Sequence, residues 1–198
     1  MNLWHDVKLG DNSPEICTAV IEINKGCKNK FELDKTYGVI KLDRVLQGAS
    51  SYPFNYGFFP QTLAHDEDPL DAVVLGSTII YPGCIVEVKP IGVIQMVDQG
   101  KTDSKIVCVP LGDISVSSYN EMTELPDYQQ RDLRRFFEEY KILENKEVVV
   151  GDSESADRAR EIIMATHRHY AEQIYSKTLF KGYPCHHRPE LIRKNESR

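Results

Sequence analysis

The segment His65-Asp-Glu-Asp-Pro-Leu-Asp-Ala-Val-Val-Leu75 places four carboxylates within six residues, immediately before a run of strand-forming residues. Carboxylates this close repel one another unless water or cations offset their charge. Pro69 disfavours a helical conformation at Asp68, and Asp71 leads into an expected strand over residues 72–75. A solvated acidic turn and a site for a hard cation such as magnesium both fit this segment. A calcium EF-hand loop does not, because its glycine and its final glutamate are missing.

Short apolar segments surround the acidic cluster through the first two-thirds of the chain, and glycines and prolines separate them. Each segment is rich in residues that favour strands, and some alternate between apolar and polar side chains. Several short strands at this spacing indicate a small barrel or sandwich. The expected strands are residues 17–23, 31–33, 39–42, 72–75, 85–97 and 105–109.

The last third of the chain has the periodicity of helices. A first helix is expected to begin near Asp127, with an apolar stripe at spacings of three and four: Leu133, Phe136, Phe137 and Tyr140. A second helix is expected over about residues 155–176, with four apolar residues on one face: Ala159, Ile163, Tyr170 and Ile174. Ser155 precedes Asp157 in the first turn, which is typical of a helix start. A short strand over residues 147–150 is expected between the two helices.

Composition indicates one soluble globular domain. Of 198 residues, 41% are apolar and 27% are charged, which is ordinary for such a domain. We expect this domain to span residues 1–180, followed by a polar and flexible tail over 181–198. The net charge of −6 argues against a protein that binds duplex nucleic acid. It leaves phosphate chemistry open, because bound metal ions and a few basic side chains can reverse the local field.

Cysteine usage and hydropathy indicate an intracellular protein. The five cysteines are odd in number and include no Cys-x-x-Cys pair, so we expect reduced thiols rather than disulfides or a zinc site. No apolar stretch approaches the roughly 20 residues that span a bilayer, so no membrane association is expected. A cytoplasmic location follows as an expectation.

Charged and aromatic residues elsewhere accompany the acidic cluster. A second acidic loop contains Asp98 and Asp103 and is followed by Lys105. Lys30 and Glu32 lie two residues apart, on the same face of an expected strand. Each such residue alone is more often a surface charge or a core ring. The others that we single out are Glu22, which interrupts an apolar run, Arg44 at a strand end, and the tyrosines Tyr52, Tyr56 and Tyr140.

In this order, these motifs closely resemble the family I soluble inorganic pyrophosphatases. The family signature, Asp-x-Asp-Pro-x-Asp before a small or aliphatic residue, occurs as Asp66-Glu-Asp-Pro-Leu-Asp-Ala72, and the resemblance runs over about residues 13–175. It implies a mainly β fold with α (α+β): a five-stranded barrel resembling the OB-fold, with two C-terminal helices packed on it. It also implies a magnesium-dependent hydrolase that splits pyrophosphate into two orthophosphates without a covalent enzyme intermediate, in a homo-oligomer.

The resemblance implies a role for each matching position. Asp66, Asp71 and Asp103 resemble ligands of a first magnesium ion. Asp71 resembles a carboxylate shared with a second ion, and Asp98 with Asp103 would hold a third. Asp68 matches the residue that takes a proton from the attacking water. The remaining matches are the metal-site carboxylates Glu22 and Glu32, the phosphate-binding residues Lys30, Arg44, Tyr56, Tyr140 and Lys141, the accessory substrate-binding residue Lys105, and the accessory position Tyr52.

One departure and two rival interpretations remain. Gln99 stands where many bacterial members carry an acid, which puts one secondary metal contact in doubt. OB-like barrels also bind single-stranded nucleic acid, so a non-catalytic binding module is the alternative function. A catalytically inactive relative is a further alternative, opposed by the near-complete set of site residues.

Overall fold

Five strands pair into a closed ring in the computed structural model, which describes residues 1–144 and 148–175. Antiparallel pairing joins β1 (Cys17–Ile23) to β4 (Asn55–Phe58), and β4 to β5 (Asp71–Val74). A parallel pairing joins β5 to β7 (Lys101–Pro110). The ring closes because β6 (Ile85–Asp98) pairs with both β7 and β1. The expected five-stranded barrel and its α+β class are confirmed.

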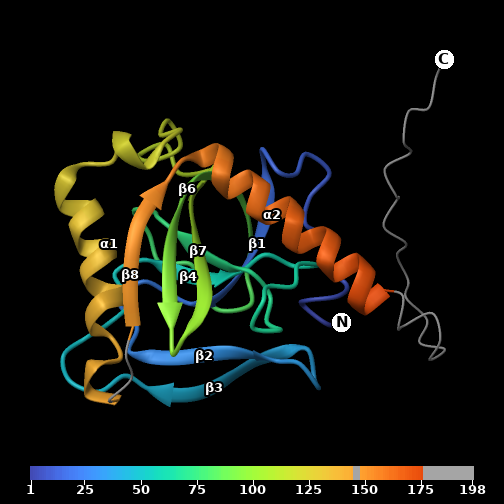
Figure 1. Ribbon diagram of the computed structural model, residues 1–198, viewed down its shortest axis with the longest axis horizontal. Coiled ribbons are helices and arrows are strands. Elements are labelled where there is room, and N and C mark those ends of the chain that lie inside the picture. The colour runs from blue at the N-terminus through green and yellow to red at the C-terminus, as the bar shows by residue number, and fades with distance from the viewer. Residues whose placement is uncertain (145–147, 176–198) are drawn as a thin grey trace.

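Three further strands lie outside this ring. β8 (Val148–Glu154) pairs with β6 and extends the sheet. β2 (Asn29–Asp34) and β3 (Val39–Val45) form a separate two-stranded hairpin that is inserted between β1 and β4. Figure 1 shows this hairpin below the barrel, at the end where the turn between β6 and β7 lies and where α1 ends. The insertion therefore adds its own side chains to that end of the barrel.

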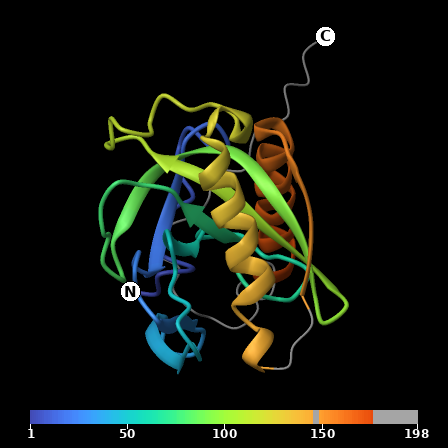
Figure 2. The same cartoon turned by 90° about the vertical axis from the view of Figure 1, so that its left-hand side faces the viewer.

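The two main helices pack on different sides of the barrel (Figures 1 and 2). α1 (Asp127–Glu139) follows the 3-10 turn η1 (Met122–Glu124) and precedes a second such turn, η2 (Ile142–Glu144). α2 (Ala156–Tyr170) continues as the π-helical turn η3 (Ala171–Tyr175). Ser155 caps α2 by accepting a hydrogen bond from the backbone N–H of Arg158 at 3.3 Å, as its sequence predicts. In the described part of the chain, no helix has both the length and the hydropathy to cross a membrane.

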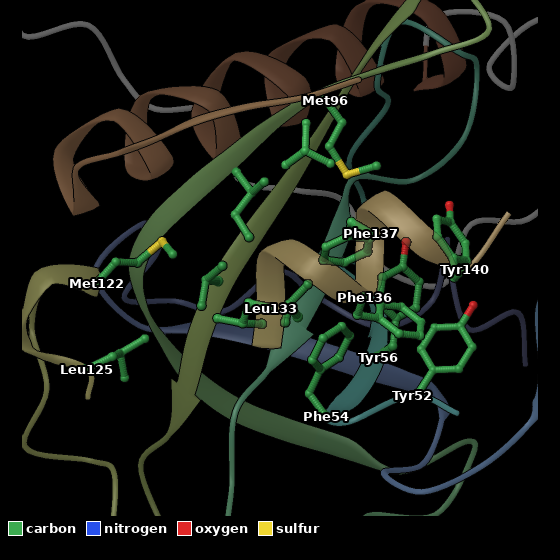
Figure 3. Close-up of a cluster of buried hydrophobic side chains, with 14 of the residues drawn as sticks. Tyr52, Phe54, Tyr56, Met96, Met122, Leu125, Leu133, Phe136, Phe137 and Tyr140 are labelled. Atoms are coloured by element: carbon green, nitrogen blue, oxygen red, sulfur yellow. The ribbon is translucent and has the colours of Figure 1, made fainter. Parts of the chain in front are cut away.

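Alternate residues of β5 and of the second half of β7 divide between two apolar clusters. Ala72 and Val74 of β5 pack with α2, whereas Val73 between them packs in the cluster beneath α1. The second cluster also holds Phe136 and Phe137 of α1, which confirms the predicted apolar stripe. Figure 3 shows the rings of this cluster gathered around α1.

The sequence predicts most strands and both main helices and misses one strand. The strand over 17–23 and the start of α1 near Asp127 are confirmed, while β7 begins four residues earlier than expected and β8 runs on to Glu154. β4 was missed because all four of its residues are buried, so it shows no alternation. Gly57 within it is required, because a Cβ there would overlap the carbonyl oxygen of Val20. The expectations for residues 147 and 176 and for the 181–198 tail lie outside the described residues.

Candidate functional site

One cleft of about 650 Å³ is lined by every residue for which the family resemblance implies a role. The barrel strands, the β2–β3 hairpin, the acidic loop before β5 and the end of α1 all contribute to it. Acidic and basic side chains therefore meet in one place although they come from distant parts of the sequence. The residues are Glu22, Lys30, Glu32, Arg44, Tyr52, Tyr56, Asp66, Asp68, Asp71, Asp98, Asp103, Lys105, Tyr140 and Lys141.

Strand register brings Asp71, Asp103 and Lys105 together. Asp71 lies opposite Lys105 in the parallel pair of β5 and β7, and Asp103 is two residues before Lys105 on the same strand face. The ammonium group of Lys105 contacts Asp71 and donates to Asp103 Oδ1 at 2.7 Å. Burial acts to lower the pKa of Lys105, but the two carboxylates outweigh it and hold that pKa well above its ordinary value. Lys105 is therefore charged at neutral pH.

Asp98 forms the second acidic position of the cleft. The ammonium group of Lys141, two residues after the end of α1, pairs with Asp98 Oδ2. Burial raises the pKa of Asp98, but the hydrogen bond and charge of Lys141 more than offset this, so the pKa lies below its usual value. In the described residues, Asp98 Oδ1 is the buried side-chain oxygen that has no hydrogen-bond partner. An ionised carboxylate with a free buried oxygen is suited to a cation ligand.

Gln99 lies in the two-residue turn between β6 and β7, and this position accounts for its backbone conformation. Asp98 pairs with Lys101 across the turn, while Gln99 and Gly100 have φ angles of 49° and 84°. Positive φ at both central residues is the conformation of the tight turns that match the twist of a hairpin. The turn therefore fixes Asp98 at the last position of β6, whether or not residue 99 is acidic.

Glu22 is a buried carboxylate that faces the cleft. Its side chain lies on β1 with a residue exposure of 7%, and Glu22 Oε1 accepts a hydrogen bond from the backbone N–H of Leu33 at 2.7 Å. Burial, together with the nearby charge of Asp71, raises the pKa of Glu22 to about 8. The interruption of the apolar run in β1 therefore has a structural reason: this position opens into a polar cavity.

Metal-free protein should become less stable between pH 5 and pH 9 because of Glu22. Its pKa in the folded chain, about 8, exceeds the ordinary value of 4.5. The stabilisation is therefore complete below the unfolded pKa and is lost as the pH rises through the folded pKa. At about 1.4 kcal/mol for each pKa unit, the change is on the order of a few kcal/mol. Urea unfolding with a chelator should show this loss in wild type and a much smaller one in Glu22→Gln; equal slopes would contradict it.

The basic wall of the cleft comes from the β2–β3 hairpin. Arg44 donates from Nε to Glu144 Oε1 at 2.8 Å and from Nη1 to Asp43 Oδ2 at 2.5 Å. Lys30 contacts Glu32, as the spacing on one strand face predicts. Burial lowers the pKa of Lys30, and the charge of Arg44 lowers it further. Lys30 and Arg44 thus both line the cleft. A bound anion there would offset the repulsion between their positive charges.

The acidic loop before β5 has a basic partner that the sequence did not indicate. The backbone N–H of Asp68 donates to Asp66 Oδ1 at 3.1 Å, which folds the loop on itself. Asp68 Oδ1 lies 2.5 Å from the ammonium nitrogen of Lys35, which directly follows the hairpin strand β2. Sequence reasoning missed Lys35 and also Glu144, because each meets its partner far along the chain.

Three tyrosines close the cleft on the side of α1. Tyr52, Tyr56 and Tyr140 belong to the apolar cluster, and Figure 3 shows their hydroxyl groups at one end of it. Burial raises the pKa of all three phenols, and the charge of Asp71 raises that of Tyr56 further. They remain protonated at neutral pH and are therefore hydrogen-bond donors in a cleft suited to an oxyanion.

The donor set of the cleft is chemically suited to a hard divalent cation. Its carboxylates supply only oxygen donors, which magnesium and manganese prefer. In residues 1–144 and 148–175, no group of three or more His, Cys, Asp or Glu side chains is close enough to hold an ion. Lysine ammonium groups lie between the carboxylates instead, with Lys105 against Asp71 and Asp103 and Lys141 against Asp98. The carboxylates of the cleft are therefore already paired with positively charged groups.

The chain is similar to a set of enzymes with one shared description. The family model described as "Inorganic pyrophosphatase" matches residues 19–171. "Soluble inorganic pyrophosphatase 4" of Arabidopsis thaliana is 44% identical over 171 residues, which cover 86% of this chain and 79% of that protein. "Soluble inorganic pyrophosphatase 2" of Chlamydomonas reinhardtii is 41% identical over 91% of this chain and 94% of its own length. The crystal structure of inorganic pyrophosphatase from Thermus thermophilus superposes with a TM-score of 0.81 at 37% identity, covering 85% of this chain and 98% of that one.

Proposed function

The chain belongs to the inorganic pyrophosphatase family and is an inorganic diphosphatase, and from this premise we propose that the cleft beside the acidic loop is its active site. Carboxylates for metal ions and cations for phosphates line the same cleft, and this single observation carries the proposal. Pyrophosphate hydrolysis needs both, because charge must be offset on the attacking and on the leaving oxygen. The alternative of a module that binds single-stranded nucleic acid has no support from the similar proteins.

Magnesium is the proposed cofactor, because the site offers hard oxygen donors and the substrate brings phosphate oxygens of its own. When bound, magnesium would lower the pKa of the attacking water and offset phosphate charge. Asp71 would hold two ions, with Asp66 and Asp103 beside it, while Asp98 and Asp103 would hold a third. Glu22 of β1 and Glu32 of the hairpin strand β2 would contribute as well, partly through water.

Asp68 is the proposed general base. Its side chain is about half exposed in the cleft, and Lys35 rather than a buried group is its partner. A carboxylate in this position can accept a proton from the attacking water while its neighbours Asp66 and Asp71 are used as ligands. Within the acidic signature, Asp68 would thus accept the proton while Asp66 and Asp71 would hold metal ions.

The basic and phenolic groups would bind the phosphates. Lys30 and Arg44 face the cleft from the hairpin, and Lys141 faces it from the end of α1. Their charges, with the protonated hydroxyls of Tyr56 and Tyr140, would stabilise negative charge on the leaving phosphate. Lys105, held between Asp71 and Asp103, would limit the repulsion among the carboxylates.

Removal of divalent metal should abolish activity. We expect purified protein to release phosphate from magnesium pyrophosphate, to fall to background with excess chelator, and to recover when magnesium is restored. The physical reason is that the carboxylates alone repel the anionic substrate. Phosphate release that persists undiminished in chelator would contradict the metal-dependent proposal. Salt-sensitive binding to a single-stranded oligonucleotide without phosphate release would favour the alternative.

A homo-oligomer is proposed from the family resemblance alone, and a cytoplasmic location from the scattered, odd-numbered cysteines that indicate reduced thiols. Light scattering of the full chain would test the first, with a mass that is a multiple of the 22.6 kDa chain as the expected result. A monomer at assay concentration would contradict it.

A further inference from the structure

Lys35 contacts three groups that lie in two distant parts of the chain. Its ammonium nitrogen lies 2.5 Å from Asp68 Oδ1 and donates to the backbone carbonyl of Glu67 at 2.9 Å. The same nitrogen lies 5.9 Å from the centre of the Trp4 ring, within the range of a cation–π contact. Lys35 thus connects the acidic loop, through two of its residues, to the N-terminal segment.

Trp4 is fixed in place on the barrel. It is 4% exposed, and its indole N–H donates to the carbonyl oxygen of Thr62 at 2.8 Å. Its ring stacks on that of His5 with centroids 4.6 Å apart. The hydroxyl oxygen of Thr62 in turn accepts a hydrogen bond at 2.9 Å from the backbone N–H of Leu70, at the end of the acidic loop. The ring beneath Lys35 and the loop beside it therefore belong to one packed unit.

The N-terminal segment also holds the turn that follows Lys35. The backbone N–H of Leu3 donates to the carbonyl oxygen of Gly38 at 3.1 Å. Gly38 has a φ of 69°, and a Cβ there would lie 2.6 Å from Asn2 Cγ, so only glycine fits against this segment. Residues 2–5 thus connect the β2–β3 hairpin to the barrel on one side of Lys35. On the other side, the Trp4 ring contacts the charged ammonium group of Lys35.

We propose that Lys35 is a positioning residue for Asp68, and that Trp4 holds the Lys35 ammonium group where it orients this carboxylate. The proposal rests on the assignment of Asp68 as general base. Asp68 is about half exposed, so its side chain would otherwise turn freely between rotamers. The pair is too exposed to add much stability, and its effect is therefore on orientation. A misplaced base slows the reaction although the substrate still binds.

The test compares kcat and KM for pyrophosphate among variants of the full chain. Lys35→Met is expected to lower kcat roughly 10-fold with KM within about 2-fold, and Lys35→Arg to restore most of the loss. Lys28→Met is the matched control, because it removes an exposed lysine directly before β2 that donates to the Gly48 carbonyl and does not line the cleft. In an Asp68→Asn background, Lys35→Met should have no further effect on kcat.

The outcomes separate this proposal from the proposed function. Loss of kcat that persists in the Asp68→Asn background would overturn the positioning role, as would full activity of Lys35→Met in an active wild type. A wild type that does not hydrolyse pyrophosphate would overturn both proposals. Trp4 is the sole tryptophan, so its fluorescence gives a readout independent of activity. Emission should change in Lys35→Met and not in Lys28→Met; unchanged emission in Lys35→Met would overturn the role of Trp4.

Discussion

Replacing Asp71 with asparagine is expected to lower phosphate release by more than roughly 100-fold without unfolding the chain. Asp71 is the carboxylate proposed to be shared between two metal ions, so its loss weakens both. The fold should survive, because Lys105 keeps its hydrogen bond to Asp103 and an asparagine carbonyl can still accept from it. Initial rates at saturating magnesium pyrophosphate, with circular dichroism to check folding, measure the effect.

Glu67→Gln is the matched control for Asp71→Asn. Glu67 lies in the same acidic loop and is exposed, and it does not line the cleft. Its replacement removes one negative charge nearby and should change the rate by less than about 3-fold, as a screened surface charge does. If Asp71→Asn hydrolysed pyrophosphate as well as wild type, the two-metal mechanism would be wrong.

Replacing Asp68 with asparagine is expected to lower kcat by roughly 10²- to 10⁴-fold, the usual contribution of a general base. Asparagine has nearly the same shape but cannot accept a proton from water. Its side chain can still contact Lys35, so the loop should keep its conformation. KM should change little, because Asp68 is not among the groups proposed to bind phosphate.

The pH profile distinguishes this loss from a change in metal binding. An asparagine at this position removes the base, so raising the pH should partly restore the rate through hydroxide. Excess magnesium should not restore it. Full recovery of Asp68→Asn at high magnesium would mean that Asp68 is a metal ligand, which contradicts its assignment.

The sequence was most informative where the chemistry is local. The acidic signature, the Lys30–Glu32 spacing and the apolar stripe of α1 each lie within a few residues, and periodicity is enough to place them on a strand or helix. Glu22 was recognisable because a carboxylate in an apolar run needs a polar environment. These residues do line one cleft, while their individual roles remain predictions.

Contacts between distant segments left no signal in the sequence. Lys35 meets Asp68, and Arg44 meets Glu144 a hundred positions further along the chain. Such pairs depend on how the barrel closes and on where the β2–β3 hairpin packs. The place of Trp4 beneath Lys35 could not be predicted either, because it follows from tertiary packing. Strand β4 was missed for a related reason, since burial on both sides removes alternation.

Within one acidic loop, Asp66 and Asp71 are proposed to hold magnesium and Asp68 to act as the base. Magnesium binding tests this assignment most directly. Calorimetric titration of metal-free wild type, Asp68→Asn and Asp71→Asn with magnesium needs no substrate and no turnover. Asp68→Asn should bind magnesium with nearly the wild-type affinity, and Asp71→Asn should bind at least roughly 10-fold more weakly. Equal weakening in both variants, or unchanged affinity in Asp71→Asn, would contradict the claim.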